Sequence, residues 1–188
     1  MLWNSGLVDV TNNLSSLHVQ RTLGNRSRLE KKGTWKDIFK YLAQSGRAFE
    51  TQDAWIKLGM FWQFDLAFGS DFYAKLCTQY RNMDNPPGTE GEKRQRFILE
   101  SSRISGFDMT PFFEKWGILV TPETKEEIAG LNLQQLNNGC LPGEDKPIWH
   151  KRDEQHVQQN LMQATQTASS FFSPATPDKA CDTPNLSM

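Results

Sequence analysis

The stretch from Asp53 to Tyr80, DAWIKLGMFWQFDLAFGSDFYAKLCTQY, decides the fold. Its large apolar side chains recur at three- and four-residue spacing, which is the period of one face of an α-helix. Gly69 interrupts the pattern, and a glycine can adopt the left-handed conformation that ends a helix. Ser70 is then a suitable N-cap for a second helix, with Asp71 favourable in its first turn. The sequence therefore predicts two consecutive aromatic helices separated at Gly69.

The aromatic side chains of this stretch are interpreted as part of a hydrophobic core. The cluster consists of Trp55, Phe61, Trp62, Phe72 and Tyr73. Each buried ring stabilises a fold by roughly 1.5–3 kcal/mol when buried apolar area is converted to free energy. An aromatic ligand-binding cleft is the alternative interpretation. Packing is favoured because helical spacing alone accounts for the pattern.

Helices are expected on both sides of the aromatic stretch. They cover about residues 8–23, 34–46, 92–104, 111–116 and 122–129. Thr34 begins a sequence that resembles a capping box, and Thr110 and Thr121 each precede a proline at the first helical position. The basic connector NRSRLEKKG, residues 25–33, is typical of a solvated loop. No segment alternates with period two, so essentially no sheet is predicted.

These signals predict an all-α fold, an irregular bundle of about six or seven helices. The bundle is assigned to residues 1–131. Residues 132–188 are rich in Gln, Asn, Ser, Thr and Pro, and are predicted to be a polar, largely disordered tail.

The composition narrows the classes of function. The net charge of −1 provides no field that steers nucleic acid or an anionic membrane. No apolar run reaches the roughly 18 residues of a membrane-spanning helix. The first residues, MLWNSGLVDVTNN, do not have the pattern of a signal peptide, so the localisation of this chain stays open.

The cysteines and histidines give no local metal motif. Cys77, Cys140 and Cys181 are widely spaced and include no C-x-x-C, so no zinc knuckle or redox dithiol is indicated. Cys77 is expected to be a small buried hydrophobe, and a Cys140–Cys181 disulfide is left open. His150 and His156 lie six residues apart rather than the four of a helical metal pair. H-E-x-x-H, G-x-S-x-G and a Gly-rich phosphate loop are all absent from the sequence.

Three segments read together resemble the enhancin-like zinc metallopeptidases, peptidase family M-sixty. They are DVTNNLSSLHVQ (9–20), KLGMFWQFDLAFGSDFYAKLCTQYR (57–81) and SGFDMTPFFEKWGILVTPET (105–124). They resemble the helix that follows the family's zinc motif, its aromatic helix pair and its closing segment, in that order. The resemblance covers roughly residues 7–131 and is closest to the AcfD-like lipoproteins and mucinases.

The resemblance implies a gluzincin, in which H-E-x-x-H supplies two histidine ligands and a catalytic glutamate, and a glutamate on the next helix completes the zinc site. Family members cleave mucin-type glycoproteins and are secreted or lie at the cell surface. Three protein ligands leave one zinc position for a water molecule, whose pKa falls towards about 7.

The sequence departs from this family pattern at the site itself. H-E-x-x-H is missing, and Asp9 stands where the family has its third-ligand glutamate. Aspartate is shorter by one methylene, about 1 Å, whereas metal–ligand distances hold within about 0.2 Å. Asp9 is therefore the one candidate metal ligand, no residue is assigned as catalytic, and no cofactor is expected in this chain alone.

The chain is accordingly interpreted as the C-terminal helical part of an enhancin-like peptidase domain, inactive by itself. A truncated gene, a split gene and a separately encoded N-terminal peptidase segment are all compatible with this interpretation. The alternative is a stand-alone helical interaction protein without catalysis. A nucleic-acid-binding helical module is a weaker third hypothesis, because NRSRLEKKGTWK is its single basic stretch.

Overall fold

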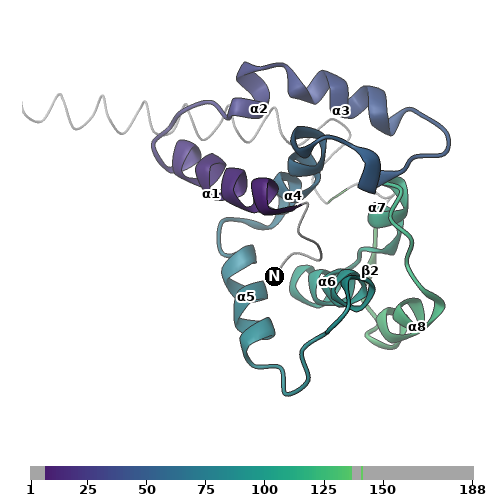
Figure 1. The fold of residues 1–188 in the computed structure, drawn as a ribbon. Helices are drawn as coiled ribbons and strands as arrows, with labels where there is room; N and C mark the ends of the chain where they lie inside the picture. The colour runs from purple at the N-terminus through teal and green to yellow at the C-terminus, as the bar shows by residue number, and fades with distance from the viewer. Residues whose placement is uncertain (1–6, 137–140, 142–188) are drawn as a thin grey trace, which may run out of the picture.

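The computed structural model describes residues 7–136 and 141, and these residues form a helical bundle (Figure 1). Its α-helices are α1 (Val8–Thr22), α2 (Arg28–Lys31), α3 (Thr34–Leu42), α4 (Ala54–Phe68), α5 (Phe72–Arg81), α6 (Glu90–Ser105), α7 (Thr110–Lys115) and α8 (Pro122–Gly130). A 3-10 helix, η2 (Phe49–Thr51), precedes α4. The all-α prediction is confirmed. None of the helices in the described part of the chain has the length and apolar character needed to cross a bilayer.

The sheet is confined to two short strands. β1 (Phe107–Asp108) pairs in parallel with β2 (Gln134–Gln135), with Phe107 opposite Gln134. This pairing joins the end of α6 to the segment that follows α8. It agrees with the expectation of essentially no sheet, since two-residue strands have no side-chain periodicity that a sequence could display.

Helix α4 is the centre of the bundle. In Figure 1 it lies between α1, α2 and α3 on one side and α5 to α8 on the other. Every residue from Lys57 to Leu66 is buried. The single apolar face expected from the sequence was too narrow, because elements that precede and follow α4 in the chain pack around it on all sides.

Both ends of α4 follow from local chemistry. The Asp53 carboxylate accepts hydrogen bonds from the backbone N–H groups of Trp55 and Ile56, at 2.7 and 3.1 Å. These bonds satisfy donors that the first turn of a helix leaves free. At the other end Gly69 has a φ of +91°, which confirms that the aromatic stretch divides there.

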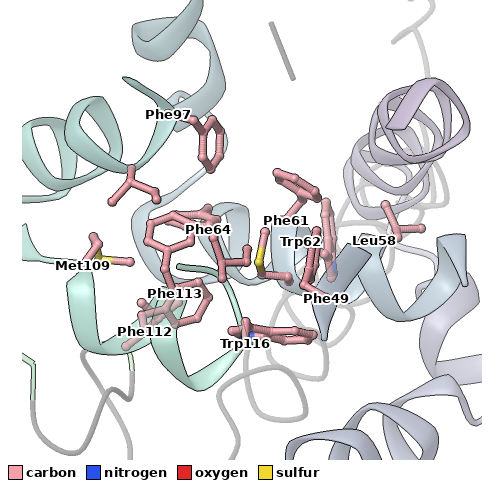
Figure 2. Close-up of a cluster of buried hydrophobic side chains, with 14 of the residues drawn as sticks. Phe49, Leu58, Phe61, Trp62, Phe64, Phe97, Met109, Phe112, Phe113 and Trp116 are labelled. Atoms are coloured by element: carbon pink, nitrogen blue, oxygen red, sulfur yellow. The ribbon is translucent and has the colours of Figure 1, made fainter. Parts of the chain in front are cut away.

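The core is built from aromatic rings of several helices (Figure 2). Phe64 of α4 lies 5.0 Å from Phe72 of α5, 5.9 Å from Phe97 of α6 and 5.2 Å from Phe112 of α7, measured between ring centroids. Edge-to-face and stacked pairs at such distances add about 0.5–1.5 kcal/mol beyond area burial. The core interpretation is confirmed for Phe61, Trp62 and Phe72, which are fully buried.

Two members of the predicted cluster lie at the edge of the core. Trp55 and Tyr73 are half-buried and pack against the core from outside. Lys32 Nζ lies 4.8 Å from the Trp55 ring centroid and Arg28 Cζ lies 5.8 Å from it, so cations cover that ring. Trp55 is in the first turn of α4, where the neighbouring surface belongs to the basic connector rather than to the core.

Several predicted caps are wrong. Ser70 does not cap α5, which begins after Asp71 without a side-chain cap. Thr34 is the first residue of α3 rather than its N-cap, and it is buried. At α7 the Asp108 carboxylate, not Thr110, accepts a hydrogen bond, from the Thr110 backbone N–H at 2.9 Å. At α3 the predicted cap Thr34 is buried, and at α7 the neighbouring Asp108 accepts the hydrogen bond, so the surroundings outweigh the local preference at these two starts.

Other local signals were confirmed or missed. The Thr121 hydroxyl accepts from the Thr124 N–H and caps α8 as predicted. Two starts were missed: α2, inside the supposed loop, is capped by Ser27, and α6 begins with a full capping box between Thr89 and Glu92.

Gly117 follows the end of α7 and lies against the backbone of Arg47, in the segment after α3. Its φ is +74°, and a Cβ added to it would lie 2.4 Å from the backbone oxygen of Arg47. Beside it, the Tyr41 hydroxyl donates a hydrogen bond of 2.7 Å to the carbonyl oxygen of Trp116. The chain after α3 and the end of α7 therefore touch through backbone, a contact that no side chain at position 117 would permit.

Part of the predicted tail is described by the structure. Residues 132–136 were assigned to the disordered tail, but Gln134–Gln135 form β2 and Leu136, 8% exposed, packs in the core. The rest of the predicted disorder, the Cys140–Cys181 pair and the spacing of His150 and His156 concern or depend on residues 137–140 and 142–188, which lie outside the described residues.

Candidate functional site

Asp9 lies in the first turn of α1 and is exposed to solvent. Its backbone carbonyl accepts a 2.8 Å hydrogen bond from Nδ2 of Asn13, one turn further along the helix. A carboxylate in the first turn also interacts favourably with the helix dipole. The position is compatible with a ligand for a metal held from outside the bundle, and equally with a residue that stabilises a helix start.

The described residues do not assemble a zinc site around Asp9. His18 follows on the same helix nine residues later, which separates the two backbones by about 13 Å at 1.5 Å per residue. Two ligands of one zinc ion each lie about 2 Å from it. Within residues 7–136 and 141 no group of three or more His, Cys, Asp or Glu side chains could hold a metal ion. The described residues therefore provide no complete metal site, and the assignment of Asp9 stays a prediction.

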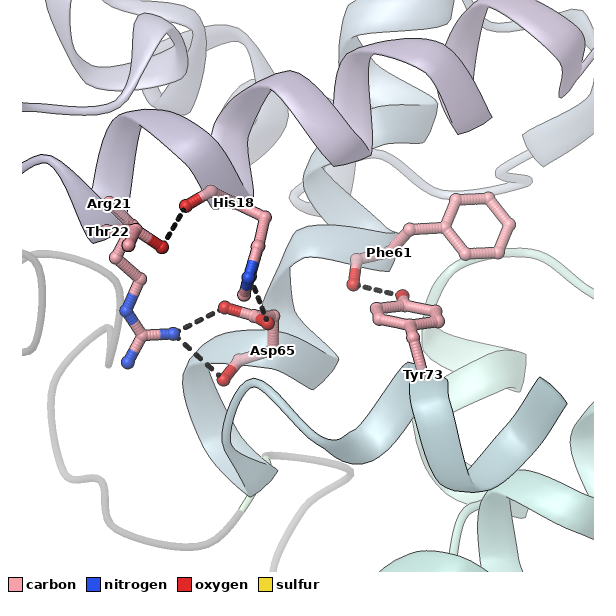
Figure 3. Close-up of polar contacts among 6 residues, drawn as sticks. All are labelled: His18, Arg21, Thr22, Phe61, Asp65 and Tyr73. Atoms are coloured by element: carbon pink, nitrogen blue, oxygen red, sulfur yellow. Dashed lines mark hydrogen bonds and ion pairs between the residues drawn. The ribbon is translucent and has the colours of Figure 1, made fainter. Parts of the chain in front are cut away.

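The structure instead brings His18, Arg21 and Asp65 together between α1 and α4 (Figure 3). Asp65 is buried, with 3% of its side chain exposed, and its carboxylate forms an ion pair with the Arg21 guanidinium. Arg21 also donates to the Asp65 backbone carbonyl at 3.2 Å. His18 Nδ1 lies 3.7 Å from the other carboxylate oxygen. The cluster ties α1 to the central helix.

An apolar cleft of about 390 Å³ opens beside this cluster. It lies between α1, α4 and α5, and its lining residues are Thr11, Leu14, Ser15, His18, Val19, Trp62, Asp65, Ser70, Tyr73, Ala74 and Cys77. Cys77 was expected to be buried and is half-buried here.

Tyr73 connects this cleft to α4. Its hydroxyl donates a short hydrogen bond to the carbonyl of Phe61. Burial, and secondarily the nearby Asp65 charge, raise the Tyr73 pKa well above its usual value, so the hydroxyl keeps its proton and remains a donor. Tyr73 is therefore a fixed wall of the cleft rather than a proton carrier.

This cluster was not predicted from the sequence, although one signal in the sequence pointed to it. Asp65 is the sole acidic residue of α4, in a helix made mostly of aromatic and aliphatic side chains. A carboxylate buried in such a helix needs a cation. Arg21 sits four turns along the neighbouring α1, and its distance of 44 residues in sequence hid the pairing. His18 lies at the rim of the same contact.

Solved structures share this arrangement of helices. A functionally unknown conserved protein from Bacillus anthracis str. Ames superposes with a TM-score of 0.69 at 39% sequence identity, over 78% of this chain and 29% of that one. The catalytic module of the metalloprotease ZmpA from Clostridium perfringens superposes with a TM-score of 0.58 at 22% identity, over 81% and 28% of the two chains. The fold is thus one that occurs within a metalloprotease catalytic module.

Sequence comparison gives the family. Residues 1–117 match the model of peptidase M60, enhancin and enhancin-like, and the chain belongs to this family. The resemblance read from the three sequence segments is confirmed.

Animal proteins carry related stretches. TRPM8 channel-associated factor 1 of Homo sapiens is 30% identical over 103 residues, which are 50% of this chain and 11% of that protein. The TRPM8 channel-associated factor homolog of Danio rerio is 24% identical over 86 residues, 46% of this chain and 9% of the relative. This chain spans about a tenth of these relatives and under a third of the two solved chains.

Proposed function

We propose that this chain supplies the helical C-terminal part of an enhancin-like zinc peptidase domain and acts only when a segment that carries H-E-x-x-H completes it. The observation that carries the proposal is the family match over residues 1–117; Asp9, which is exposed on α1, is the proposed third ligand from the sequence resemblance. The completing segment contributes H-E-x-x-H, which the sequence lacks. Zinc bound there would activate a water molecule for peptide hydrolysis.

The substrate class follows from the family resemblance. Mucin-type glycoproteins outside the cell are the proposed substrates of the completed domain, which is secreted or lies at the cell surface. The ion pair of Arg21 with Asp65 and the buried Val10 and Leu14 hold α1, the helix that carries Asp9, on the central helix. A ligand supported by a packed scaffold in this way keeps its position to the tolerance that metal sites need.

A stand-alone helical interaction protein is the second candidate. The observation that favours it is the similarity to animal proteins that are named as factors associated with the TRPM8 channel. If this chain works in that way, its helical surface binds a protein partner and the family's chemistry plays no part.

The test is zinc analysis and a mucin-cleavage assay on the chain alone and together with a segment that carries H-E-x-x-H. We expect no stoichiometric zinc and no cleavage by the chain alone, and both with the segment. Asp9→Ala should remove zinc from the combination, whereas Asp9→Glu should strengthen it and change nothing in the isolated chain. Submicromolar zinc affinity in the isolated chain, lost in Asp9→Ala, would overturn the proposal of an incomplete site.

A further inference from the structure

A second pocket lies between α2 and the first half of α3, at the side of the bundle that these two helices form (Figure 1). Its volume is about 350 Å³, and its lining residues are Glu30, Gly33, Trp35, Lys36 and Phe39. It shares no lining residue with the cleft between α1, α4 and α5. Ligand pockets measure about 300–1,000 Å³, so this one has room for a single small ring.

Two aromatic side chains give the pocket an apolar wall. Trp35 is buried and Phe39 is half-buried, and both come from α3. They are four residues apart, so they lie on the same side of that helix. Aromatic surfaces of this kind pack against the apolar face of a ligand ring, and the few polar groups beside them then fix its orientation.

Glu30 provides a hydrogen-bond acceptor at the edge of this wall. Its side chain is 12% exposed, and Oε1 lies 3.1 Å from Nε of Arg26. The other oxygen, Oε2, is buried and has no hydrogen-bond partner among the residues that the structure describes. A buried carboxylate oxygen without a donor is costly. A ligand that brings a hydroxyl group to Oε2 therefore satisfies an acceptor that the free protein leaves unpaired.

Positive charge surrounds the pocket. Residues 26–40 contain six lysines and arginines and two carboxylates, a net charge of +4, whereas the whole chain has a net charge of −1. Lys36 lines the pocket and is exposed, and exposed Lys40 follows one turn later on the same side of α3. Helix α3 also begins here, at Gly33, and no described side chain caps it. Its positive end favours an anion at this position.

We propose that this pocket binds an acidic sugar, a hydroxyl-bearing ring that carries a carboxylate or sulfate group. The aromatic wall contacts the ring, Glu30 accepts a hydrogen bond from a hydroxyl, and Lys36 with the start of α3 holds the acidic group. The net charge of +4 disfavours a cationic ligand, and a purely apolar ligand would leave both Glu30 and Lys36 without a partner. Binding requires neither zinc nor a segment that carries H-E-x-x-H, so the inference goes beyond the proposed function.

Nuclear magnetic resonance titrations of the full chain test the proposal. The probes are two matched pairs: glucuronic acid with glucose, and galactose 6-sulfate with galactose. The assigned Trp35 indole N–H signal should shift and saturate with the acidic sugars, whereas that of Trp116, which is buried in the core, should stay in place. Each neutral sugar should bind at least about fivefold more weakly than its acidic counterpart, since it lacks the ion pair.

Two lysine variants separate a built pocket from a merely basic surface. Lys36→Gln should weaken binding of the acidic sugars about fivefold. Lys31→Gln is the matched control, because Lys31 is exposed in the same basic stretch but does not line the pocket. Its effect should stay below about twofold, as expected for a charge that is screened by solvent.

Glu30→Gln gives the sharpest result, because the two explanations predict opposite signs. If positive charge alone attracts the ligand, removing a carboxylate should strengthen binding. If Glu30 accepts a hydroxyl, the weaker amide acceptor should reduce binding about fivefold. Tighter binding by Glu30→Gln, or equal losses in Lys36→Gln and Lys31→Gln, would overturn the proposal.

The probes also identify other ligands. Inorganic sulfate that shifts the Trp35 signal and binds as tightly as the acidic sugars would indicate a simple anion site. A single-stranded oligonucleotide that displaces the sugars at lower concentration would indicate a nucleic-acid site. Either result refutes the proposal, and so does a Trp35 signal that no acidic sugar shifts.

Discussion

Replacing Gly117 by alanine should destabilise the protein far more than the same change at Gly106. Both glycines have left-handed backbone conformations, with φ of +74° and +77°. An L-residue pays about 1–2 kcal/mol in this region, so that cost is common to the two variants. Their surroundings differ, because a Cβ at Gly106 meets nothing within 4 Å, whereas a Cβ at Gly117 would meet the Arg47 carbonyl oxygen at 2.4 Å and its carbon at 2.7 Å.

The backbone at Arg47 is held in place and cannot retreat cheaply. Its guanidinium donates to the carbonyls of Leu42 at 3.2 Å and Gln44 at 2.6 Å, and Tyr41 is bonded to Trp116 from the other side. Forcing a methyl group into a packed contact costs about 1–3 kcal/mol. We therefore expect Gly106→Ala to lose about 1–2 kcal/mol of unfolding free energy and Gly117→Ala about 2–5 kcal/mol.

Urea unfolding followed by circular dichroism measures the difference. The midpoint should fall in both variants, and further for Gly117→Ala, with an unchanged dependence on urea if the unfolded state is the same. Equal losses in the two variants would show that the Arg47 segment yields freely, and the packing argument for Gly117 would then be wrong.

Three further predictions concern the core, the buried ion pair and the tyrosines. Trp62→Ala should lower the free energy of unfolding by roughly 3–5 kcal/mol, because the side chain is fully buried. Trp55 is half-buried, so Trp55→Ala should cost less than half as much. An unchanged melting temperature for Trp62→Ala would instead indicate a surface cleft. Arg21→Met should cost about 3–5 kcal/mol by leaving the Asp65 carboxylate buried without its cation, and the double variant Arg21→Met with Asp65→Leu should recover part of that loss in chemical denaturation. The chain has three tyrosines, and burial raises the pKa of each: Tyr41, Tyr73 and Tyr80. The folded protein therefore binds more protons than the unfolded chain above pH about 10. The stability that the protonated tyrosines contribute is complete below that pH and is lost as the pH rises further. Tyrosinate absorbance should appear in the native protein at higher pH than in the chain unfolded in urea, and coincident titrations would contradict this prediction.

The fold class could be predicted from the sequence because helical periodicity and helix stops are local signals. The break at Gly69 and the cap at Thr121 are examples, and both are where the sequence places them. The caps predicted at Ser70 and Thr34 failed because burial and neighbouring residues decide between nearby starts. The all-round burial of α4 could not be predicted, since a sequence shows which side chains are apolar and not how many elements surround them.

The candidate site was likewise predictable from the sequence only in part. Asp9 was found through its position in a family pattern, and the structure places it in solvent on α1. The pairing of Arg21 with Asp65 spans 44 residues and has no local signature, so it needed the packing of α1 on α4 to appear. The exposure of Val8 and Val19 was not predicted, because an apolar residue in a helix is normally expected to face the core.

The position of α4 in the chain also constrains synthesis. One side of this helix is covered by α1 and α3, which are synthesised before it. The other side is covered by Phe97, Phe112 and Phe113, which are synthesised after it. Until α7 has emerged, Phe64 has water on one side, and a nascent chain that stalls before that point presents an uncovered aromatic helix. Such surfaces bind chaperones and aggregate. The growing polypeptide is therefore vulnerable for the forty-odd residues between Phe68 and Phe113, and codon choice over that interval sets how long the exposure lasts.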